Sequence, residues 1–162
     1  MPPTALHRAD EPTPAGFLCG LLDDEIRTVL SYTQGRRFSR GSFVIRRGES
    51  DRSLYIVTAG ALEVLLITPN GPLSILELRS GDLFGEMAFF DGLPRSAGVR
   101  AIEDTEVLVM TPDGFERLRL AEPRLAVCFL MELGCILSAR VRAGNQRLVS
   151  AHAVTELAEG LV

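Results

Sequence analysis

The sequence contains no lysine and no tryptophan, and it has only two histidines. Its 17 basic side chains are therefore all arginines, and 21 carboxylates outnumber them, which gives a formal net charge of −4. Broad binding to a nucleic-acid backbone normally needs clustered cations, so this balance argues against a nucleic-acid partner. No apolar run reaches the roughly 20 residues that cross a bilayer, and no secretory signal is visible, so we expect a cytoplasmic protein without a membrane partner.

The scarce histidines and cysteines exclude further classes of function. His7 and His152 both lie near the chain ends, whereas a histidine metal site or a Ser-His-Asp triad needs a histidine within the folded body. The three cysteines, Cys19, Cys128 and Cys135, show no metal-ligand spacing, and free cysteines more often pack as small apolar residues. We therefore expect a reduced protein that is not an enzyme and has no metal or cofactor.

The order of residue patterns predicts one domain over residues 17–149, preceded by a flexible lead over residues 1–16. Residues 17–32 have apolar residues at helical spacing, with Asp23 or Asp24 as the N-cap. Asn70-Gly71 marks a hairpin turn, and short strand-like runs follow one another from about residue 36 to 110, at 43–45, 54–57, 62–67, 73–78, 99–102 and 107–110. Short strands between glycine turns favour a closed or double-sheet β architecture over a βαβ layout. We therefore expect a mainly β fold, a jelly-roll β-barrel (a double-stranded β-roll) with helices at both ends.

The helical pattern returns over residues 112–149. Thr111 is the expected N-cap, Pro112 lies in the first turn, and Pro123 opens a second helix that we expect to end at Leu148. That helix starts apolar on nearly all sides, so one face can pack on the β-roll while another meets a second copy. We predict a homodimer through residues 123–148, with burial inside the monomer as the alternative. Residues 150–162 are expected to be a short tail without a DNA-binding domain.

Residues 84–97 differ from their surroundings, with a glycine and a carboxylate at one end and an arginine and a hydroxyl at the other. Gly85 allows the backbone to approach a ligand closely. Arg95 offers a planar fork of donors that matches two phosphate oxygens, and the Ser96 hydroxyl can donate to the same group. An ionised Glu86 only accepts hydrogen bonds, so it suits ligand hydroxyls such as those of a ribose. Taken singly, Glu86 could instead cap a helix, and Arg95 could lie on a solvated surface.

The combined pattern resembles the phosphate-binding cassette of the cyclic nucleotide-binding domain family, which includes catabolite activator protein and the regulatory subunits of cAMP-dependent kinase. The family pattern has F-G-E, an apolar residue, alanine, a spacer and then R-(S/T/A)-A. The matching residues are Phe84, Gly85, Glu86, Ala88, Arg95, Ser96 and Ala97, and further landmarks are Gly48, Asp51, Gly60, Gly81 and Asp82. The resemblance covers about residues 17–148.

The resemblance implies a role for each cassette residue. Arg95 would pair with the cyclic phosphate, which Ser96 and the Ala97 N–H would also bind, and Glu86 would hold the ribose 2′-hydroxyl beside Gly85. Apolar contacts to ribose and base would come from Val64 and Ile75, and a possible base contact from Asn145. The ligand would be cAMP or cGMP, because Ser96 is compatible with either base.

These implications predict a small, bacterial, cytoplasmic cyclic nucleotide sensor that performs no chemistry on its ligand. Its output would pass through an unknown downstream protein. Two alternatives remain: a ligand-free jelly-roll scaffold for dimerisation, and an enzyme of the cupin type. The absence of histidines from the body of the chain argues against the second. Arg140, Arg142 and Arg147 are expected to form a solvated helix face that could meet a partner's carboxylates.

Overall fold

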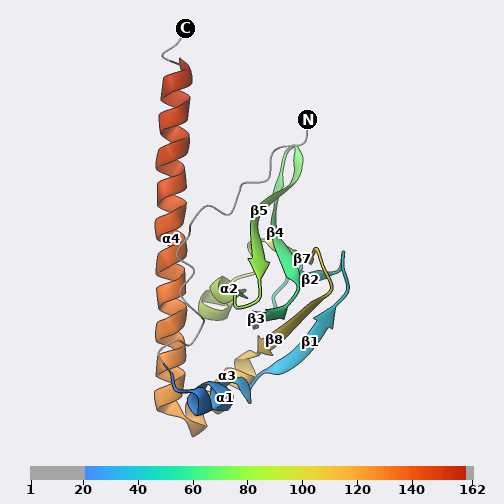
Figure 1. Cartoon of the computed structure of the whole chain (residues 1–162), viewed down its shortest axis with the longest axis vertical. Coiled ribbons are helices and arrows are strands. Elements are labelled where there is room, and N and C mark those ends of the chain that lie inside the picture. The colour runs from blue at the N-terminus through green and yellow to red at the C-terminus, as the bar shows by residue number, and fades with distance from the viewer. Residues whose placement is uncertain (1–20, 160–162) are drawn as a thin grey trace.

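The computed structural model describes residues 21–159 (Figure 1). The predicted lead over residues 1–16, with His7 and Cys19, lies outside the described residues. The helices are α1 (Asp23–Leu30), α2 (Glu86–Asp91), α3 (Pro112–Ala121) and α4 (Pro123–Glu159). The strands are β1 (Gln34–Phe38), β2 (Phe43–Ile45), β3 (Leu54–Ala59), β4 (Ala61–Thr68), β5 (Gly71–Arg79), β6 (Leu83–Phe84), β7 (Gly98–Ala101) and β8 (Thr105–Met110).

The eight strands form two antiparallel sheets of four strands each, in the orders β1-β8-β3-β6 and β2-β7-β4-β5. Side chains from the facing surfaces fill the space between the sheets; these are Ile45, Tyr55, Val57, Leu62, Leu78, Phe84, Val99, Ala101, Val107 and Val109. Alternation along each strand brings them to the same side, because successive side chains of a strand point to opposite faces. This interior joins the two sheets into one β-roll.

Helices cover the other face of the β1-β8-β3-β6 sheet and form a third layer. Leu54 and Ile56 of β3 point into this layer, between the positions that face the sheet interior. They pack with Leu118 of α3 and with Phe129 and Leu133 of α4, all three of which are fully buried. Strand β3 is therefore buried on both faces over Leu54–Val57, which explains its continuous apolar sequence.

The predicted hairpin is confirmed, with the loop shifted by one residue. Strands β4 and β5 pair from Ala61 opposite Arg79 to Thr68 opposite Gly71, so Pro69 and Asn70 form the loop. Gly71 has a φ of 109°, a conformation that glycine adopts without steric cost. The predicted helix start at Thr111 is also confirmed, because the Thr111 side chain accepts a hydrogen bond from the Gly114 N–H at 3.0 Å.

Four details of the sequence prediction are wrong. Helices hold more residues than strands, with 37 in α4 alone, so the fold is not mainly β. The described strands form two facing sheets, which confirms the double-stranded β-roll, but they do not close into a barrel. Helix α4 continues past Leu148 to Glu159, into the predicted tail. Helix α1 takes Leu22 as its N-cap, and Asp23 and Asp24 lie in the first turn, where negative charge is favourable.

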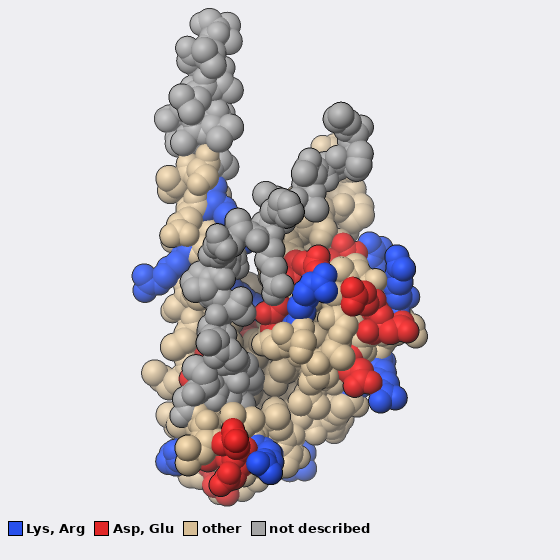
Figure 2. Space-filling model, viewed as in Figure 1, with Lys and Arg blue, Asp and Glu red and all other residues tan. Residues whose placement is uncertain are grey.

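The surface carries charges of both signs. On the face shown in Figure 2, basic and acidic side chains lie interspersed, without a broad basic patch. Among residues 21–159, no helix is long and apolar enough to cross a membrane.

Candidate functional site

Residues 84–97 form a short strand, one helical turn and a loop. Strand β6 ends at Phe84, and Gly85 then takes a φ of 84° as the N-cap of α2. A Cβ at Gly85 would lie 2.7 Å from Nη1 of Arg95 and 2.9 Å from the Ser53 carbonyl oxygen. Both the backbone conformation and the close approach therefore require glycine. Helix α2 ends at Asp91, before Gly92 with a φ of 68°.

The Arg95 side chain lies inside the protein, at 4% exposure. Its Nη1 donates to the Gly85 carbonyl at 2.9 Å, and its Nη2 donates to Oδ2 of Asp51 and to the Ser53 carbonyl, both at 2.6 Å. The Nε atom is also buried but has no hydrogen-bond partner. Buried donors are nearly always paired, so this unpaired donor on a held guanidinium suits an anionic ligand.

Asp51 and Tyr55 hold the guanidinium in place. The Tyr55 hydroxyl donates to Oδ2 of Asp51 at 2.8 Å, and the Arg95 guanidinium carbon lies 5.6 Å from the centre of the Tyr55 ring. Partial burial would by itself raise the pKa of Asp51, but hydrogen bonds from Arg95, Ser53 and Tyr55 lower it to about 2. Burial and the hydrogen bond to Asp51 raise the pKa of Tyr55 to about 12. Asp51 is therefore ionised, and Tyr55 is neutral, at physiological pH.

The second cassette charge, Glu86, pairs with a residue of α4. Arg140 donates from Nη1 to Oε1 of Glu86 at 2.7 Å, and from Nη2 to the Leu83 carbonyl. The Glu86 side chain is 10% exposed and that of Arg140 is 29% exposed. Arg140 therefore lies over the carboxylate that was predicted to bind ribose, and it connects α4 directly to the cassette.

The other predicted site residues lie at different depths. Ser96 is exposed and its hydroxyl contacts Sδ of Met87 at 3.6 Å, while Ala97 beside it is half-buried. Val64 on β4 and Ile75 on β5 are half-buried. Ile75 is an extra residue of β5 without a partner on β4, between the pairs Val64–Leu76 and Leu65–Ser74. Asn145 is exposed on α4, five residues beyond Arg140, a rise of about 7.5 Å along a helix.

Among residues 21–159, no three His, Cys, Asp or Glu side chains gather as metal ligands. The described part of the site thus consists of two arginines, two carboxylates and a tyrosine. The arginines can donate hydrogen bonds to an anion, and a carboxylate can accept hydrogen bonds from hydroxyl groups.

A family model, the cyclic nucleotide-binding domain, matches residues 35–122, which include the whole cassette together with Asp51 and Tyr55. The chain belongs to the cyclic nucleotide-binding domain family. Among the curated relatives, the cyclic AMP receptor protein of Thermus thermophilus is 32% identical over 130 residues, which are 80% of this chain and 58% of that protein. A cAMP-dependent protein kinase regulatory subunit of Emericella nidulans is 33% identical over 82 residues, 51% of this chain and 19% of that subunit.

Solved structures of the family share the fold. A cyclic nucleotide-binding domain from Methylobacillus flagellatus superposes with a TM-score of 0.76 at 29% identity, covering 81% of this chain and 74% of that one. The chain spans less than two thirds of the curated relatives described above, 58% in the Thermus case.

Sequence reasoning found the two charged cassette residues of this family member but missed their partners. Asp51 was noted only as a landmark, 44 positions from Arg95, and Arg140 was expected on a solvated face, 54 positions from Glu86. The expectation for Arg140 is wrong, because it pairs with a carboxylate of its own chain. One feature of the sequence could have indicated a partner for Arg140: it lies where the residues of α4 change from mostly apolar to mostly polar.

Proposed function

We propose that this chain is a sensor that binds a cyclic mononucleotide at Arg95 and Glu86 and does not react with it. The observation that carries the proposal is the buried Arg95 guanidinium, held by Asp51 and Ser53 but with Nε unpaired. The cyclic phosphate would accept hydrogen bonds from Arg95, the Ser96 hydroxyl and the Ala97 N–H. A ribose hydroxyl would donate to Glu86, beside Gly85.

The contact between Arg140 and Glu86 supplies a mechanism for transmitting binding. In this structure Arg140 occupies one oxygen of Glu86, so a ribose hydroxyl has to share the carboxylate or displace the guanidinium. Either event changes a contact that fixes α4 against the cassette. A ligand that binds better to the rearranged state shifts the population toward it. The α4 helix would therefore carry the signal out of the β-roll.

We assign the base contacts to residues outside the cassette. Val64 and Ile75 would provide the apolar surface under ribose and base, and Asn145 remains a candidate for a base contact through movement of α4. Ser96 suits either cAMP or cGMP, and we favour cAMP because the curated relatives include a cyclic AMP receptor protein and cAMP-dependent kinase subunits. The output would pass through another protein in the cytoplasm.

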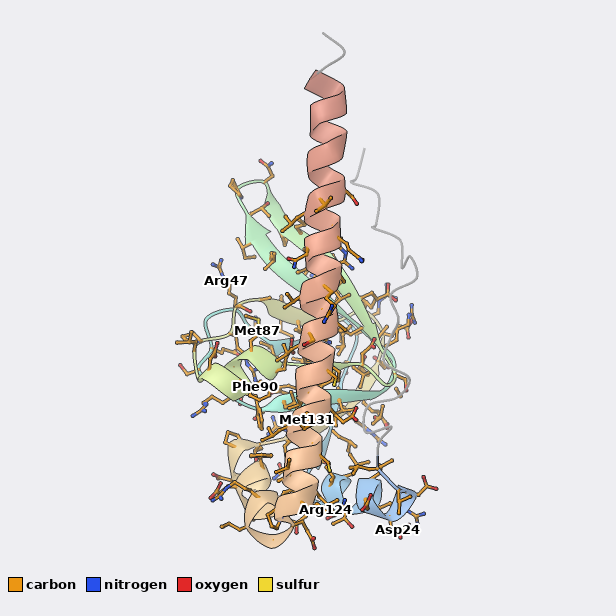
Figure 3. All side chains as sticks on the ribbon, turned by 90° about the vertical axis from the view of Figure 1, so that its left-hand side faces the viewer. Asp24, Arg47, Met87, Phe90, Arg124 and Met131 are labelled. Atoms are coloured by element: carbon orange, nitrogen blue, oxygen red, sulfur yellow. The ribbon has the colours of Figure 1, made fainter. Side chains whose placement is uncertain are left out.

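A second copy of the chain is the first partner that we propose, bound through α4. Figure 3 shows α4 in front of the β-roll with Met131 on its outer side, and Val127, Met131, Val141 and Leu148 are all at least 60% exposed. Val141 and Leu148 are seven residues apart, and Val127 lies fourteen before Val141. Seven-residue spacing places these side chains on one helix face, as in a coiled-coil seam, with Gly134 at the position between Val127 and Val141. Asn145, four residues after Val141, would lie at this seam.

Calorimetric titration tests the ligand directly. The full chain is titrated with cAMP, cGMP and cyclic dinucleotides, with 5′-AMP as the control for the open phosphate ester. We expect binding of cAMP and weak or no binding of 5′-AMP. Arg95→Lys keeps the charge but loses the planar fork, and should weaken cAMP binding about tenfold to a hundredfold, the effect of losing a charged hydrogen bond worth about 1.5–3 kcal/mol.

Two controls decide how a failure is interpreted. Arg117→Lys, on the exposed face of α3, should leave cAMP binding unchanged. Thermal unfolding of Arg95→Lys shows whether the variant is folded before its affinity is compared. No heat with any cyclic nucleotide would contradict the proposed sensor and favour a ligand-free scaffold, and equal affinity in Arg95→Lys would contradict the phosphate role.

A further inference from the structure

A hollow of about 240 Å³ lies on the outer face of the β2-β7-β4-β5 sheet, away from the cassette charges. The hollow is lined by apolar residues, Phe43, Leu65, Ile67 and Pro72. Gly98, which has no side chain, also lines it. These residues face outward because their neighbours Val64 and Val99 point into the interior. Phe43 is 36% exposed and Ile67 is 61% exposed. The sheet thus displays a small hollow with an apolar floor to solvent.

Three arginines, Arg46, Arg47 and Arg100, line the same hollow. The charge of Arg100 is balanced by Glu63, whose Oε1 accepts hydrogen bonds from Nε at 2.9 Å and from Nη2 at 2.6 Å. Arg46 lies over the ring of Phe43, with 4.7 Å between the guanidinium carbon and the ring centre. Within residues 21–159, neither Arg46 nor Arg47 forms an ion pair.

Arg46 and Arg47 thus place two positive charges beside the apolar floor. The carboxylate of Glu49, on the same turn, accepts a hydrogen bond from the Arg46 backbone N–H at 3.0 Å and from neither guanidinium group. Figure 3 shows Arg47 extending away from the body on the side where α2 lies. Arginine binds carboxylates through paired hydrogen bonds and stacks on aromatic rings. A ligand that is only anionic would leave the apolar floor exposed, and one that is only apolar would leave the guanidinium groups without partners.

We propose that this hollow is a docking site for an acidic segment of a partner protein, which inserts one large apolar side chain and places carboxylates on Arg46 and Arg47. Charge complementarity around an apolar floor favours this occupant, because protein interfaces combine a desolvated apolar centre with a polar rim. The proposal deepens the proposed function, because it names the chemistry of the downstream partner, and in that respect it rests on that function.

The backbone connects this hollow to the phosphate site. The Gly48 N–H, next to Arg47, donates to the Arg95 carbonyl at 2.8 Å, and the Arg95 N–H donates to the Glu49 carbonyl at 2.9 Å. Gly98 lies on the hollow floor three residues after Arg95. The turn that carries Arg46 and Arg47 is thus fixed to the residue that would bind the phosphate, so a shift at one position moves the other.

The test uses the full isotope-labelled chain and a synthetic hexapeptide with two acidic residues on each side of a Phe-Leu pair. We expect the peptide to move the amide resonances of Leu65, Ile67 and Gly98 while those of α3 stay in place. Arg47→Glu should weaken the peptide about tenfold or more at low salt, because attraction becomes repulsion. Arg117→Glu, the same change at an exposed position on α3, should have little effect.

Two peptide controls separate this site from a general anion-binding surface. Replacing the Phe-Leu pair by Ala-Ala should abolish binding, and Ile67→Ser, which removes apolar floor without adding charge, should weaken the original peptide several-fold. No binding of the acidic peptide, equal binding of the alanine peptide or of a short single-stranded DNA, or an unchanged affinity in Arg47→Glu would each overturn the proposal.

A parallel titration with cAMP distinguishes the two proposals. Peptide binding without cAMP binding supports the docking site and contradicts the proposed sensor. Binding of cAMP without peptide binding contradicts the docking site alone.

Discussion

Removing the charge of Arg140 while keeping its apolar stem should destabilise the protein measurably. Arg140→Met leaves Glu86, whose side chain is only 10% exposed, without the guanidinium that now lies 2.7 Å from its Oε1. The substitution also leaves the Leu83 carbonyl without its donor. A hydrogen bond to a charged group contributes about 1.5–3 kcal/mol. Because the Arg140 side chain is 29% exposed, solvent screens the pair, and we expect the lower part of that range, about 2 kcal/mol.

Thermal unfolding followed by circular dichroism measures this loss. For a domain of this size, 1 kcal/mol corresponds to about 2–4 °C in Tm, so Arg140→Met should unfold about 4–8 °C below the parent chain. Arg142→Met is the matched control, because Arg142 is exposed on the same helix, and it should change stability by less than about 0.5 kcal/mol. All variants are compared at one protein concentration, since a dimer through α4 would make Tm depend on it.

A double-mutant cycle with Glu86→Gln isolates the pair. Once Glu86 is neutral, Arg140→Met should cost much less than in the parent chain, and the difference is the coupling energy of the two side chains. Equal losses in Arg140→Met and Arg142→Met, or no coupling between Arg140 and Glu86, would refute the idea that this contact fixes α4 to the cassette.

Three further predictions follow from the same geometry. Because its native pKa is about 2 instead of 3.8, ionised Asp51 should stabilise the fold above pH 4 and lose that effect as the pH falls toward 2. Asp51→Asn should remove this part of the acid dependence in urea unfolding, and an unaltered profile would contradict it. The pKa of Tyr55 is raised from 10.0 to about 12, so stability should fall as the pH rises through that interval, but not in Tyr55→Phe; parallel alkaline curves would argue against a neutral Tyr55. Val141→Glu should give a monomer in analytical ultracentrifugation while Gln146→Glu does not, and unchanged assembly in both would exclude the α4 seam.

The sequence was sufficient to predict the strands and helices in which buried positions are apolar at regular spacing. Strands β3 and β4 have apolar residues at alternating or continuous positions because they face the interior. Strand β1 was missed because its residues, QGRRF, are nearly all exposed and it pairs only with β8 at a sheet edge. The end of α4 was placed too early because polar residues are frequent from Arg140 to Arg147, although no proline interrupts the helix up to Glu159. In an exposed helix without proline, no change in the spacing of apolar residues marks where the helix ends.

The residues of the site likewise fall into those that the sequence could predict and those that it could not. The cassette residues are local in sequence, so Gly85, Glu86, Arg95 and Ser96 could be recognised together. Their partners Asp51 and Arg140 come from distant elements, and only tertiary packing of α4 and the loop before β3 brings them to the cassette. A local pattern contains no information about such pairs, so sequence reasoning could place the charges but not the contacts that hold them.

A crystal structure of the full chain with cAMP tests directly whether Arg95 and Glu86 bind the nucleotide. We expect the cyclic phosphate within hydrogen-bond distance of Nε of Arg95 and a ribose hydroxyl on Glu86. Arg140 should have moved from its present contact or share Glu86 with the ligand. A nucleotide whose phosphate lies away from Arg95, with the guanidinium still bound only to Asp51, Ser53 and Gly85, would contradict it.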